Sequence, residues 1–430
     1  MTTKTIEGKR ETEQGEQKGQ GRALPEGWRW VKLGDIAETC SGTTPSRKIA
    51  DYYSGSIPWV KTGELLDNAI SDTEEYISDL ALKKTSLKVL PVNTVLIAMY
   101  GQGKTRGRTG RLLVPATTNQ ACFAILPNPE VFDSEFIQWW FRHIYLKLRQ
   151  ETDGRGGNQP NLNGKLLKAR IVPLPPIAEQ KRIVGILSDR LAAVDQARQA
   201  TQAQLEAAQA LPAAYLRQIF NSPEAQTWET LPLGDCLTHI QAGKSVSCVE
   251  IPANSDEWGV LKVSAVSWQK FDPEANKVLP SDFTPDPEHE VKTGDLLISR
   301  ANTTELVGAV VLVRKTRPRL MLSDKTLRLD IKPQKAVKEY LEIVLREKQA
   351  RAFIEENATG TSDSMKNISQ KLIRKIPILL PSLETQKVIS KRINNREPEI
   401  ERMRQSLQDQ LDTINALPAA LLRQAFNGEL

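Results

Sequence analysis

The chain repeats itself with a period near 200 residues, and this repeat constrains its fold more than any other feature. Residues 210–221 (ALPAAYLRQIFN) return 206 residues later as residues 416–427 (ALPAALLRQAFN). Near the start of the repeat, residues 33–35 (LGD) return 200 residues later as residues 233–235. A repeated sequence unit folds as a repeated structural unit. The sequence therefore predicts two tandem copies of one fold.

The first part of each copy carries short apolar runs between Gly- and Pro-rich turns. Examples are residues 94–100 (TVLIAMY) in one copy and 295–300 (DLLISR) in the other. Such runs are typical of a mostly-β domain with a few helices, one of them expected over residues 134–145. The predicted fold class is α+β. Two mostly-β domains are separated by two long helices, which form an antiparallel coiled coil with a pseudo-two-fold axis between the repeats.

The second part of each copy is predicted to be helical. Between residues 177 and 211 there is no proline and a single glycine, Gly185. Apolar or small residues recur there every seven positions, which indicates a coiled-coil seam. Pro398 is expected to kink or restart the second helix. If the second helix returns antiparallel, the C-terminus ends near the first domain; the alternative is that each helix packs only on its own domain. The seam residues are Leu187, Val194, Thr201, Ala208, Ile393, Ile400, Leu407 and Ile414.

These features divide the chain into five segments: a polar tail at residues 1–22, a first domain at 23–176, a central helix region at 177–222, a second domain at 223–382 and a C-terminal helix region at 383–430. The tail is expected to be disordered. It has no apolar core of a signal peptide, and no apolar run reaches the length of a membrane helix, so a cytoplasmic location is expected. The four cysteines lack metal-site spacing, and no metal is expected.

A basic loop is predicted after the apolar run at residues 94–100. Residues 98–105 (AMYGQGKT) fit a relaxed P-loop, but a P-loop requires a helix directly after Lys-Thr. Here a basic stretch and a second apolar run follow, so a hairpin loop unopposed by acids is the preferred interpretation. Its cations would contact DNA phosphates or a groove, and a plain solvated loop is the alternative. The candidates are Lys104, Arg106, Arg108 and Arg111, with Arg300, Asn302, Arg314 and Lys315 in the second copy.

A second candidate loop lies just before each helical part. Residues 154–163 (GRGGNQPNLN) offer amides that suit adenine edges and an arginine that suits guanine or phosphate. Asn- and Gly-rich segments are also common in ordinary turns, which is the alternative. The candidates are Arg155, Asn158, Gln159, Asn161 and Asn163, with Lys366 and Asn367 in the second copy. No catalytic constellation is found, and the net charge of +6 permits a polyanionic partner.

Two segments resemble a known family. Residues 174–184 (LPPIAEQKRIV) are similar to the entry into the spacer helices of type I restriction–modification specificity (S) subunits. Residues 24–36 (LPEGWRWVKLGDI) resemble the opening of their target-recognition domains. The second helix entry departs from the pattern, with Thr385 where a glutamate is usual.

The resemblance implies a non-catalytic subunit that binds double-stranded DNA. Each target-recognition domain would read one half of a bipartite site, and the helices would separate the domains and dock two modification (methyltransferase) subunits. Restriction (translocase/nuclease) subunits would join that core. S-adenosylmethionine, ATP and Mg²⁺ would belong to the partners, and this chain would bind no cofactor. The alternatives are a coiled-coil scaffold that binds only protein and a P-loop nucleotide-binding enzyme.

Overall fold

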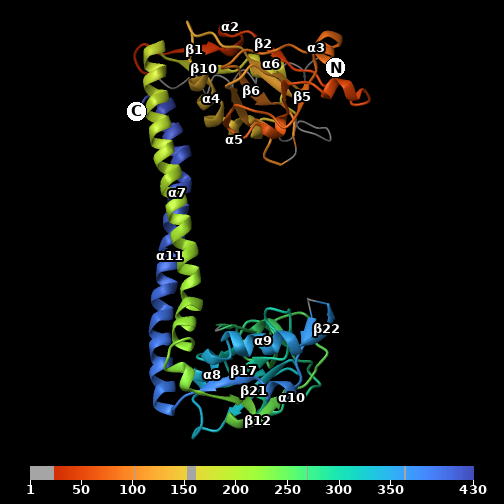
Figure 1. Ribbon diagram of the computed structural model, residues 1–430, viewed down its shortest axis with the longest axis vertical. Coiled ribbons are helices and arrows are strands. Elements are labelled where there is room, and N and C mark those ends of the chain that lie inside the picture. Colours follow the sequence, from red (N-terminus) through yellow and green to blue (C-terminus); the bar gives the residue numbers. More distant parts are fainter. Residues whose placement is uncertain (1–23, 102, 153–160, 269, 363–364) are drawn as a thin grey trace. The chain divides into compact units, whose positions relative to one another are not determined.

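The computed structural model describes residues 24–101, 103–152, 161–268, 270–362 and 365–430 (Figure 1). The chain separates into two compact units. The first unit joins the residues up to Gln202 to Asp409–Leu430, and the second comprises Ala203–Gln408. The globular parts are here called domain 1 (residues 24–176) and domain 2 (residues 223–382).

Domain 1 is built on a five-stranded sheet of order β2-β9-β6-β7-β4, with a three-stranded sheet β5-β3-β8 and the pair β1-β10. Along the central strand β6, side chains alternate between the two faces of the sheet. Val95 and Ile97 accordingly join the core that contains Phe136, whereas Leu96 and Ala98 join a second core. The strands are β1 (Arg29–Lys32), β2 (Thr39–Ser41), β3 (Ile57–Val60), β4 (Asn68–Ile70), β5 (Tyr76–Ile77), β6 (Val95–Ala98), β7 (Thr109–Leu112), β8 (Thr117–Thr118), β9 (Cys122–Ile125) and β10 (Ile171–Leu174). The helices are α2 (Leu33–Ile36), α3 (Asp79–Lys84), α4 (Ser134–His143), α5 (Tyr145–Gln150) and α6 (Gly164–Lys168), with 3-10 turns η1 (Ala50–Tyr53) and η2 (Thr62–Glu64).

Domain 2 repeats this topology, except that its main sheet has four strands where domain 1 has five. Its main sheet has the order β12-β21-β17-β19, and its three-stranded sheet has the order β16-β13-β20. The register is the same in both domains, because Ile97 faces Phe123 and, 201 residues on, Ile298 faces Leu327. The strands are β11 (Glu229–Pro232), β12 (Leu237–Ala242), β13 (Gly259–Leu261), β14 (Val266–Ser267), β15 (Lys270–Phe271), β16 (Asn276–Val278), β17 (Leu296–Ser299), β18 (Ala301–Asn302), β19 (Val310–Leu312), β20 (Leu320–Met321), β21 (Thr326–Ile331), β22 (Thr359–Ser362), β23 (Met365–Asn367) and β24 (Pro377–Leu380). The helices are α8 (Lys338–Val344), α9 (Lys348–Asn357) and α10 (Gln370–Ile373), with 3-10 turns η3 (Ala225–Thr227), η4 (Leu233–Cys236), η5 (Val263–Ala265) and η6 (Pro287–His289). The predicted tandem α+β repeat is confirmed.

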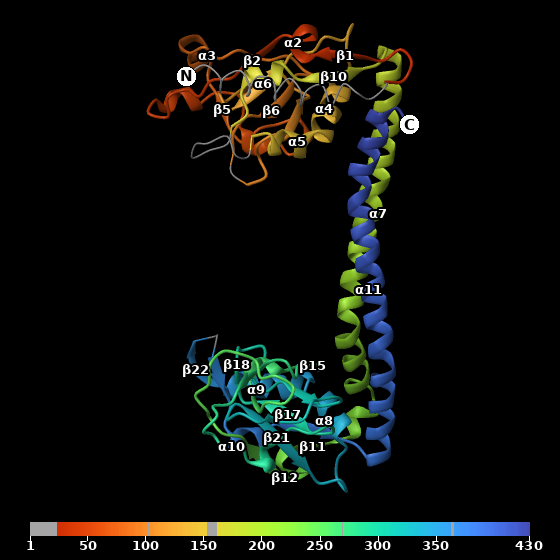
Figure 2. The same ribbon diagram turned by 180° about the vertical axis from the view of Figure 1, so that it is seen from behind.

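The long helices α7 (Ile177–Phe220) and α11 (Leu383–Asn427) run antiparallel within each unit (Figures 1 and 2). In the first unit, Arg182 near the start of α7 donates to the backbone oxygen of Leu430, just beyond the end of α11 (2.6 Å). In the second unit, Arg396 near the start of α11 donates to the Tyr215 hydroxyl near the end of α7 (3.0 Å). The expected restart at Pro398 is wrong, because α11 is continuous through this residue. Pro398 has no backbone N–H to donate, but the hydrogen bonds of the neighbouring turns and the packing against α7 keep α11 helical there.

The end of each helix is anchored in a domain core by an aromatic residue of the repeat. Phe426 of α11 packs edge-on against Phe136 and Trp140 of domain 1, with ring centroids 5.3 and 5.0 Å apart. Its repeat equivalent Phe220 of α7 packs against Trp228 of domain 2 at 6.2 Å. Domain 1 is therefore packed against both the start of α7 and the end of α11. Of the seam residues, Val194 and Ile414 are partly buried and the other six are buried.

A buried glutamine joins the start of each long helix to its domain. The Gln180 side chain accepts a hydrogen bond from the Asp133 backbone N–H (2.8 Å) and donates to the carbonyls of Val131 and Pro175. Gln386 accepts from the Val337 N–H (3.0 Å) and donates to the carbonyls of Lys335 and Pro381. Both side chains are fully buried, so each amide satisfies backbone groups that water cannot reach. This role explains why the glutamine is repeated while Glu179 is replaced by Thr385.

The repeated Leu-Gly-Asp triplet marks a close backbone approach. Leu33 N–H donates to the Arg170 carbonyl, and Leu233 N–H donates to the Ile376 carbonyl, both at 2.8 Å. A Cβ atom on the glycine that follows each leucine would lie 3.2 Å from the Lys168 carbonyl oxygen in domain 1 and 3.0 Å from that of Arg374 in domain 2. Glycine therefore lets each domain close its first and last segments together. Within the described residues, no helix is long and apolar enough to span a membrane.

Candidate nucleic-acid interface

The first predicted loop is a hairpin between β6 and β7. Gly107 N–H donates to the Ala98 carbonyl (2.8 Å) at the end of β6, and the chain then enters β7. No helix follows Lys104 and Thr105, so there are no helix N-terminal amides to hold a nucleotide phosphate. The preference for a hairpin over a P-loop is confirmed. Within the described residues, no group of three or more His, Cys, Asp or Glu could hold a metal ion.

The expectation that this basic loop is unopposed by acids is wrong. Arg111 lies on β7 and forms an ion pair with Glu135 of α4 (2.8 Å), and Arg108 lies 4.0 Å from Asp67. Arg106 is buried. Lys104 remains exposed, and its carbonyl accepts from the Tyr145 hydroxyl (2.7 Å). The acids come from segments far away in sequence, which a local count of charges does not detect.

In each domain the chain at the end of the second predicted loop lies beside the first loop. In domain 1, Leu162 N–H donates to the Met99 carbonyl (3.0 Å). In domain 2, Ile368 N–H donates to the Arg300 carbonyl (2.9 Å). These four residues are equivalent in the repeat, so the fold brings the same two segments together twice. Asn163 also caps α6 by accepting from Leu166 N–H (2.9 Å), and Asn161 is exposed. Arg155, Asn158 and Gln159 lie outside the described residues.

In domain 2 the two segments form a small sheet of order β18-β23-β22. Asn302 of β18 pairs with Lys366 of β23, and Ala301 pairs with Asn367. Lys366 Nζ donates to the Gly360 carbonyl (3.2 Å). Arg300 is partly exposed at the start of this sheet. The predicted residues Asn302 and Lys366 are therefore direct cross-strand neighbours, and Asn367, the next residue of β23, points to the opposite face of the sheet.

The remaining predicted residues of domain 2 lie elsewhere. Arg314 forms an ion pair with Glu342 of α8 at 2.8 Å, and that carboxylate is buried. This pair raises the pKa of Arg314 and fixes its side chain against α8. Glu342 also accepts from the Leu312 N–H (2.8 Å), which gives this pair a structural role. Lys315 is exposed.

A cavity of about 620 Å³ opens beside the small sheet of domain 2. Asn302 and Met365 line it, together with four lysines that the sequence did not single out. We call this the lysine basin, defined by Lys244, Lys262, Lys277 and Lys325 with the acids Glu250 and Asp324. Glu250 pairs with Lys277 and with Lys262, the latter at 3.4 Å. The hydrogen bond from Lys277 is the main cause of the lowered pKa of Glu250. The repeat places a lysine at equivalent positions, Lys61 and Lys262, which marks this position in the sequence. The other lysines of the cavity come from other segments, so the sequence alone does not show that they lie together.

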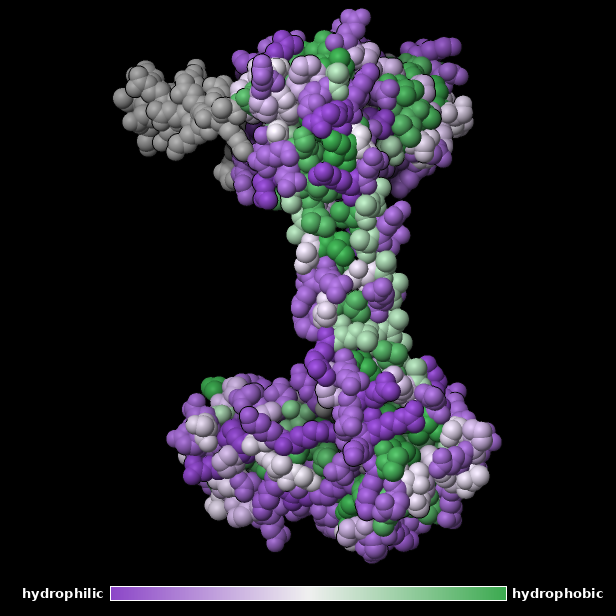
Figure 3. Space-filling view, turned by 90° about the vertical axis from the view of Figure 1, so that its left-hand side faces the viewer, coloured by the Kyte–Doolittle hydropathy of each residue, from purple (hydrophilic) through white to green (hydrophobic). Residues whose placement is uncertain are grey.

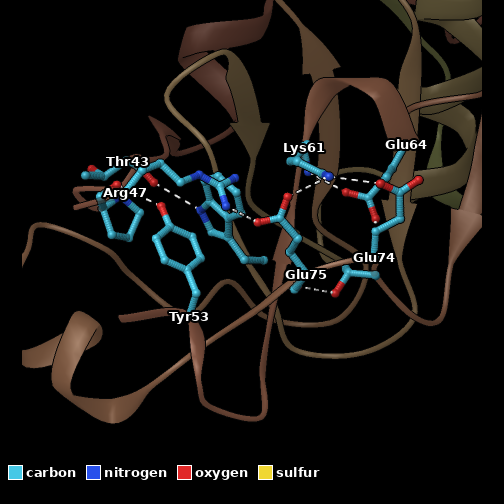
Figure 4. A network of polar contacts seen from close by, with 10 residues as sticks. Thr43, Arg47, Tyr53, Lys61, Glu64, Glu74 and Glu75 are labelled. Carbon is cyan, nitrogen blue, oxygen red and sulfur yellow. Dashed lines mark hydrogen bonds and ion pairs between the residues drawn. The ribbon is translucent and has the colours of Figure 1, made fainter. Parts of the chain in front are cut away.

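Domain 1 has a dense ion-pair network on its corresponding three-stranded sheet (Figure 4). Lys61 donates to Glu74 (2.9 Å) and to Glu75 (2.8 Å), while Glu64 accepts from the backbone N–H groups of Lys61 and Glu74. Arg47 also pairs with Glu75. The hydrogen bonds from Arg47 and then Lys61 lower the pKa of Glu75 to about 2.

Arg47 is held on its other side by two aromatic rings. Its guanidinium carbon lies 4.2 Å from the ring centre of Tyr53 and 5.2 Å from that of Trp59, a cation–π arrangement. Tyr53 donates to the Pro45 carbonyl (2.7 Å), and the Trp59 indole donates to the Thr43 carbonyl (3.1 Å). The network thus ties residues 43–53 to β3.

Fold and site together define a class: a tandem-repeat recognition protein, in which two copies of one domain present paired loops and are joined by antiparallel helices. A model of the type I restriction modification DNA specificity domain matches residues 25–207. Over 430 aligned residues, the chain is 24% identical to the EcoKI specificity subunit of Escherichia coli K12, covering 95% of this chain and 90% of that protein. It is 33% identical to the EcoEI specificity subunit of E. coli over 201 residues, which span 46% of this chain and 34% of that relative.

Solved structures have the same fold. The HsdS subunit from Thermoanaerobacter tengcongensis matches with a TM-score of 0.64 and 18% identity, covering 95% of this chain and 99% of that one. A chain from a structure of a type I restriction–modification system matches with a TM-score of 0.70 and 19% identity, covering 95% of this chain and all of that one. Residues 25–207 thus resemble the DNA-specificity domain of type I restriction–modification systems, and nearly the whole chain is similar to a specificity subunit of such a system.

Proposed function

We propose that this chain selects the DNA sequence for a type I restriction–modification complex, with each domain reading one half of a bipartite site. The chain itself performs no chemistry in this proposal. S-adenosylmethionine, ATP and Mg²⁺ serve the partner subunits, which are two modification (methyltransferase) subunits and the restriction (translocase/nuclease) subunits. The partners methylate adenine and cut the DNA, and this chain supplies register and sequence.

The observation that carries the proposal is the pairing of the two loops in both domains. One backbone hydrogen bond joins the segments in each domain, from Leu162 to Met99 and from Ile368 to Arg300. The scaffold is repeated, but the side chains on it differ between the copies. DNA sequence is read by side chains that reach base edges, whereas a common scaffold fixes their position. Two domains with the same fold but different loop side chains are suited to a DNA site whose two halves differ in sequence.

The long helices suit a second role, the docking of partner subunits. Val388, Met403 and Leu417 of α11 are 65, 49 and 40% exposed. Figure 3 shows apolar side chains among polar ones along the visible face of the helix pair. These residues stand singly along α11, so each would give a bound partner one apolar contact, and they do not form a continuous apolar patch. We infer that the modification subunits bind there.

Methylome sequencing tests the proposal. The host is compared with a strain that lacks this gene and with the deletion strain after the gene is restored. We expect one bipartite adenine-methylated sequence to disappear on deletion and to return on restoration. An unchanged methylome in the deletion strain would contradict DNA selection by this chain. A protein-only scaffold predicts instead that substitutions in the paired loops leave the methylated sequence unaltered.

A further inference from the structure

The lysine basin of domain 2 and the acidic network of domain 1 occupy equivalent places in the repeat. Strand β3 corresponds to β13, since both are the central strands of the three-stranded sheets. Pro58 faces Tyr76 in domain 1, and its counterpart Gly259 faces Val278 in domain 2. This register makes Lys61 the equivalent of Lys262 and Glu75 the equivalent of Lys277. The position of Lys61 and Lys262 is positive in both copies. The position of Glu75 and Lys277 is negative in domain 1 and positive in domain 2.

In domain 1 the cations at the equivalent position are already neutralised by carboxylates of the same domain. Lys61 has two carboxylate partners, and Arg47 is engaged by Glu75 and by the rings of Tyr53 and Trp59. The network has three acids for its two cations, with Glu64 as the third acid (Figure 4). Binding a phosphate here would require breaking several ion pairs and adding one more negative charge. This place in domain 1 therefore disfavours an anion.

In domain 2 the balance is reversed. The basin holds four lysines and two acids, and Lys262 and Lys277 are both 30% exposed at the side chain. Glu250 bridges these two lysines, and its own side chain is 72% exposed. It lies in the segment between β12 and β13 rather than in a strand. An exposed carboxylate in a loop is held weakly, because water competes for it, so another anion can replace it at low cost.

The position of the basin relates it to the paired loops. Asn302 of β18 and Met365 of β23 line the same cavity as the lysines, and Met365 is 45% exposed. A polyanion that lies on the small sheet of domain 2 would therefore extend over the basin. Duplex DNA presents a regular row of phosphates, and lysines that contact them fix its register.

We propose that the lysine basin of domain 2 binds the DNA backbone, with a phosphate taking the place of Glu250 between Lys262 and Lys277. Domain 1 makes no such contact at the equivalent place. The two domains therefore hold DNA by different backbone contacts in spite of their common fold. This inference rests on the proposed function, because it assumes that the chain binds duplex DNA.

Salt-dependent binding measurements test the proposal. The full chain, assembled with its modification subunits, is titrated into a fluorescent duplex of about 30 base pairs that carries the bipartite site found by methylome sequencing. Variants Lys262→Gln, Lys277→Gln and the double variant are compared with Lys371→Gln, an exposed lysine of α10 outside the basin. A lost phosphate contact reduces the slope of log K against log salt by about 0.9. We expect each basin variant to bind roughly 3- to 10-fold more weakly with this smaller slope, and the Lys371 variant to bind like the wild type.

Two further variants separate the parts of the proposal. Glu250→Gln removes the internal counter-ion and should tighten DNA binding, whereas Lys61→Gln in domain 1 should leave the salt slope unchanged. Folding of each variant is checked by thermal unfolding. If the folded double variant keeps the wild-type affinity and slope, the basin is only a solvated lysine cluster and the proposal is overturned. An unaltered affinity of Glu250→Gln overturns the counter-ion role. If the wild-type complex itself fails to bind the duplex, the proposed function is what has failed.

Discussion

At the scale of single residues, the buried glutamines explain a sequence motif that charge and hydropathy do not. The Gln180 amide satisfies one backbone donor and two carbonyls at the junction of domain 1 and α7. An apolar side chain of similar size would fill the volume but leave these groups without a partner. Each buried polar group left without a hydrogen bond costs about 1–3 kcal/mol.

The first prediction follows from this geometry. Gln180→Leu should lower the free energy of unfolding by about 2–4 kcal/mol, because several backbone groups lose their partner at once. Gln386→Leu should have an effect of the same size in the second unit. Gln199→Leu, on an exposed face of α7, is the matched control and should change stability little. Urea unfolding followed by tryptophan fluorescence measures all three, and equal stability of Gln180→Leu and Gln199→Leu would contradict the role of the buried amide.

The second prediction concerns pH. Because the pKa of Glu75 lies near 2, below its ordinary value of 4.5, its ion pairs stabilise the folded domain above about pH 4.5. That stabilisation is lost as the pH falls toward 2. Glu75→Gln should therefore be less stable than the wild type at pH 7, with the difference shrinking between pH 4.5 and 2. Since the network is partly exposed, we expect a difference of roughly 1–3 °C in Tm at pH 7. A difference in Tm that does not vary with pH would show that Glu75 acts through packing.

The candidate site was predicted from the sequence only in part, for a physical reason. The two loops were found from local composition and from the repeat, and the fold brings them together. The acid partners of Arg108 and Arg111 lie on other elements, so a local run of basic residues gave the wrong charge environment. Lys277 stands beside Lys262 only because β16 pairs with β13 in one register. Such neighbours depend on strand pairing, which the residues of one segment do not encode by themselves.

At the scale of elements, the long helices were the most predictable part of the chain. A heptad of apolar residues requires one stripe of each helix to be buried, whatever the details of the domains. The antiparallel packing of the two helices was the preferred of two alternatives, and it agrees with the contacts of Arg182 and Arg396. The effect of Pro398 was overestimated, because tertiary packing along a long helix outweighs the loss of one backbone hydrogen bond.

The third prediction tests whether the helices set the spacing of the two half-sites. Seven residues inserted after Gln204 and seven after Gln410 keep both heptads in phase and lengthen each helix by about 10 Å. That length corresponds to roughly three base pairs at about 3.4 Å each. The paired insertion should lengthen the unread spacer and leave both half-sites unchanged. Either insertion alone leaves inserted seam residues without a partner, so the single variants should be less stable or less active. Mapping of methylated sites decides, and an unaltered spacer with full activity in the paired variant would contradict the role of the helices.

At the scale of the whole molecule, the two ends of each domain's chain lie side by side in one antiparallel strand pair. In domain 2 this is the antiparallel pair β11 and β24, in which Glu229 faces Leu380 and Pro232 faces Pro377. In domain 1 the pair β1 and β10 has the same role, with Arg29 facing Leu174. The chain therefore enters and leaves each domain at one place. Each domain can therefore be exchanged as one continuous segment, provided that the new domain offers the same pocket to the helix residues Phe220 or Phe426.

The fourth prediction follows from this strand pairing and from the repeated junctions at residues 210–221 and 416–427. Exchange of residues 223–382 for the equivalent domain of another specificity subunit should change one half of the methylated sequence and leave the other half and the spacer length unaltered. The mirror exchange of residues 23–176 should change only the other half, and it serves as the matched control. Both proteins keep α7 and α11, so any change in the sequence comes from the exchanged domain. If one exchange alters both halves, or if neither exchange alters any, then the domains do not read DNA independently and the two-reader proposal is wrong.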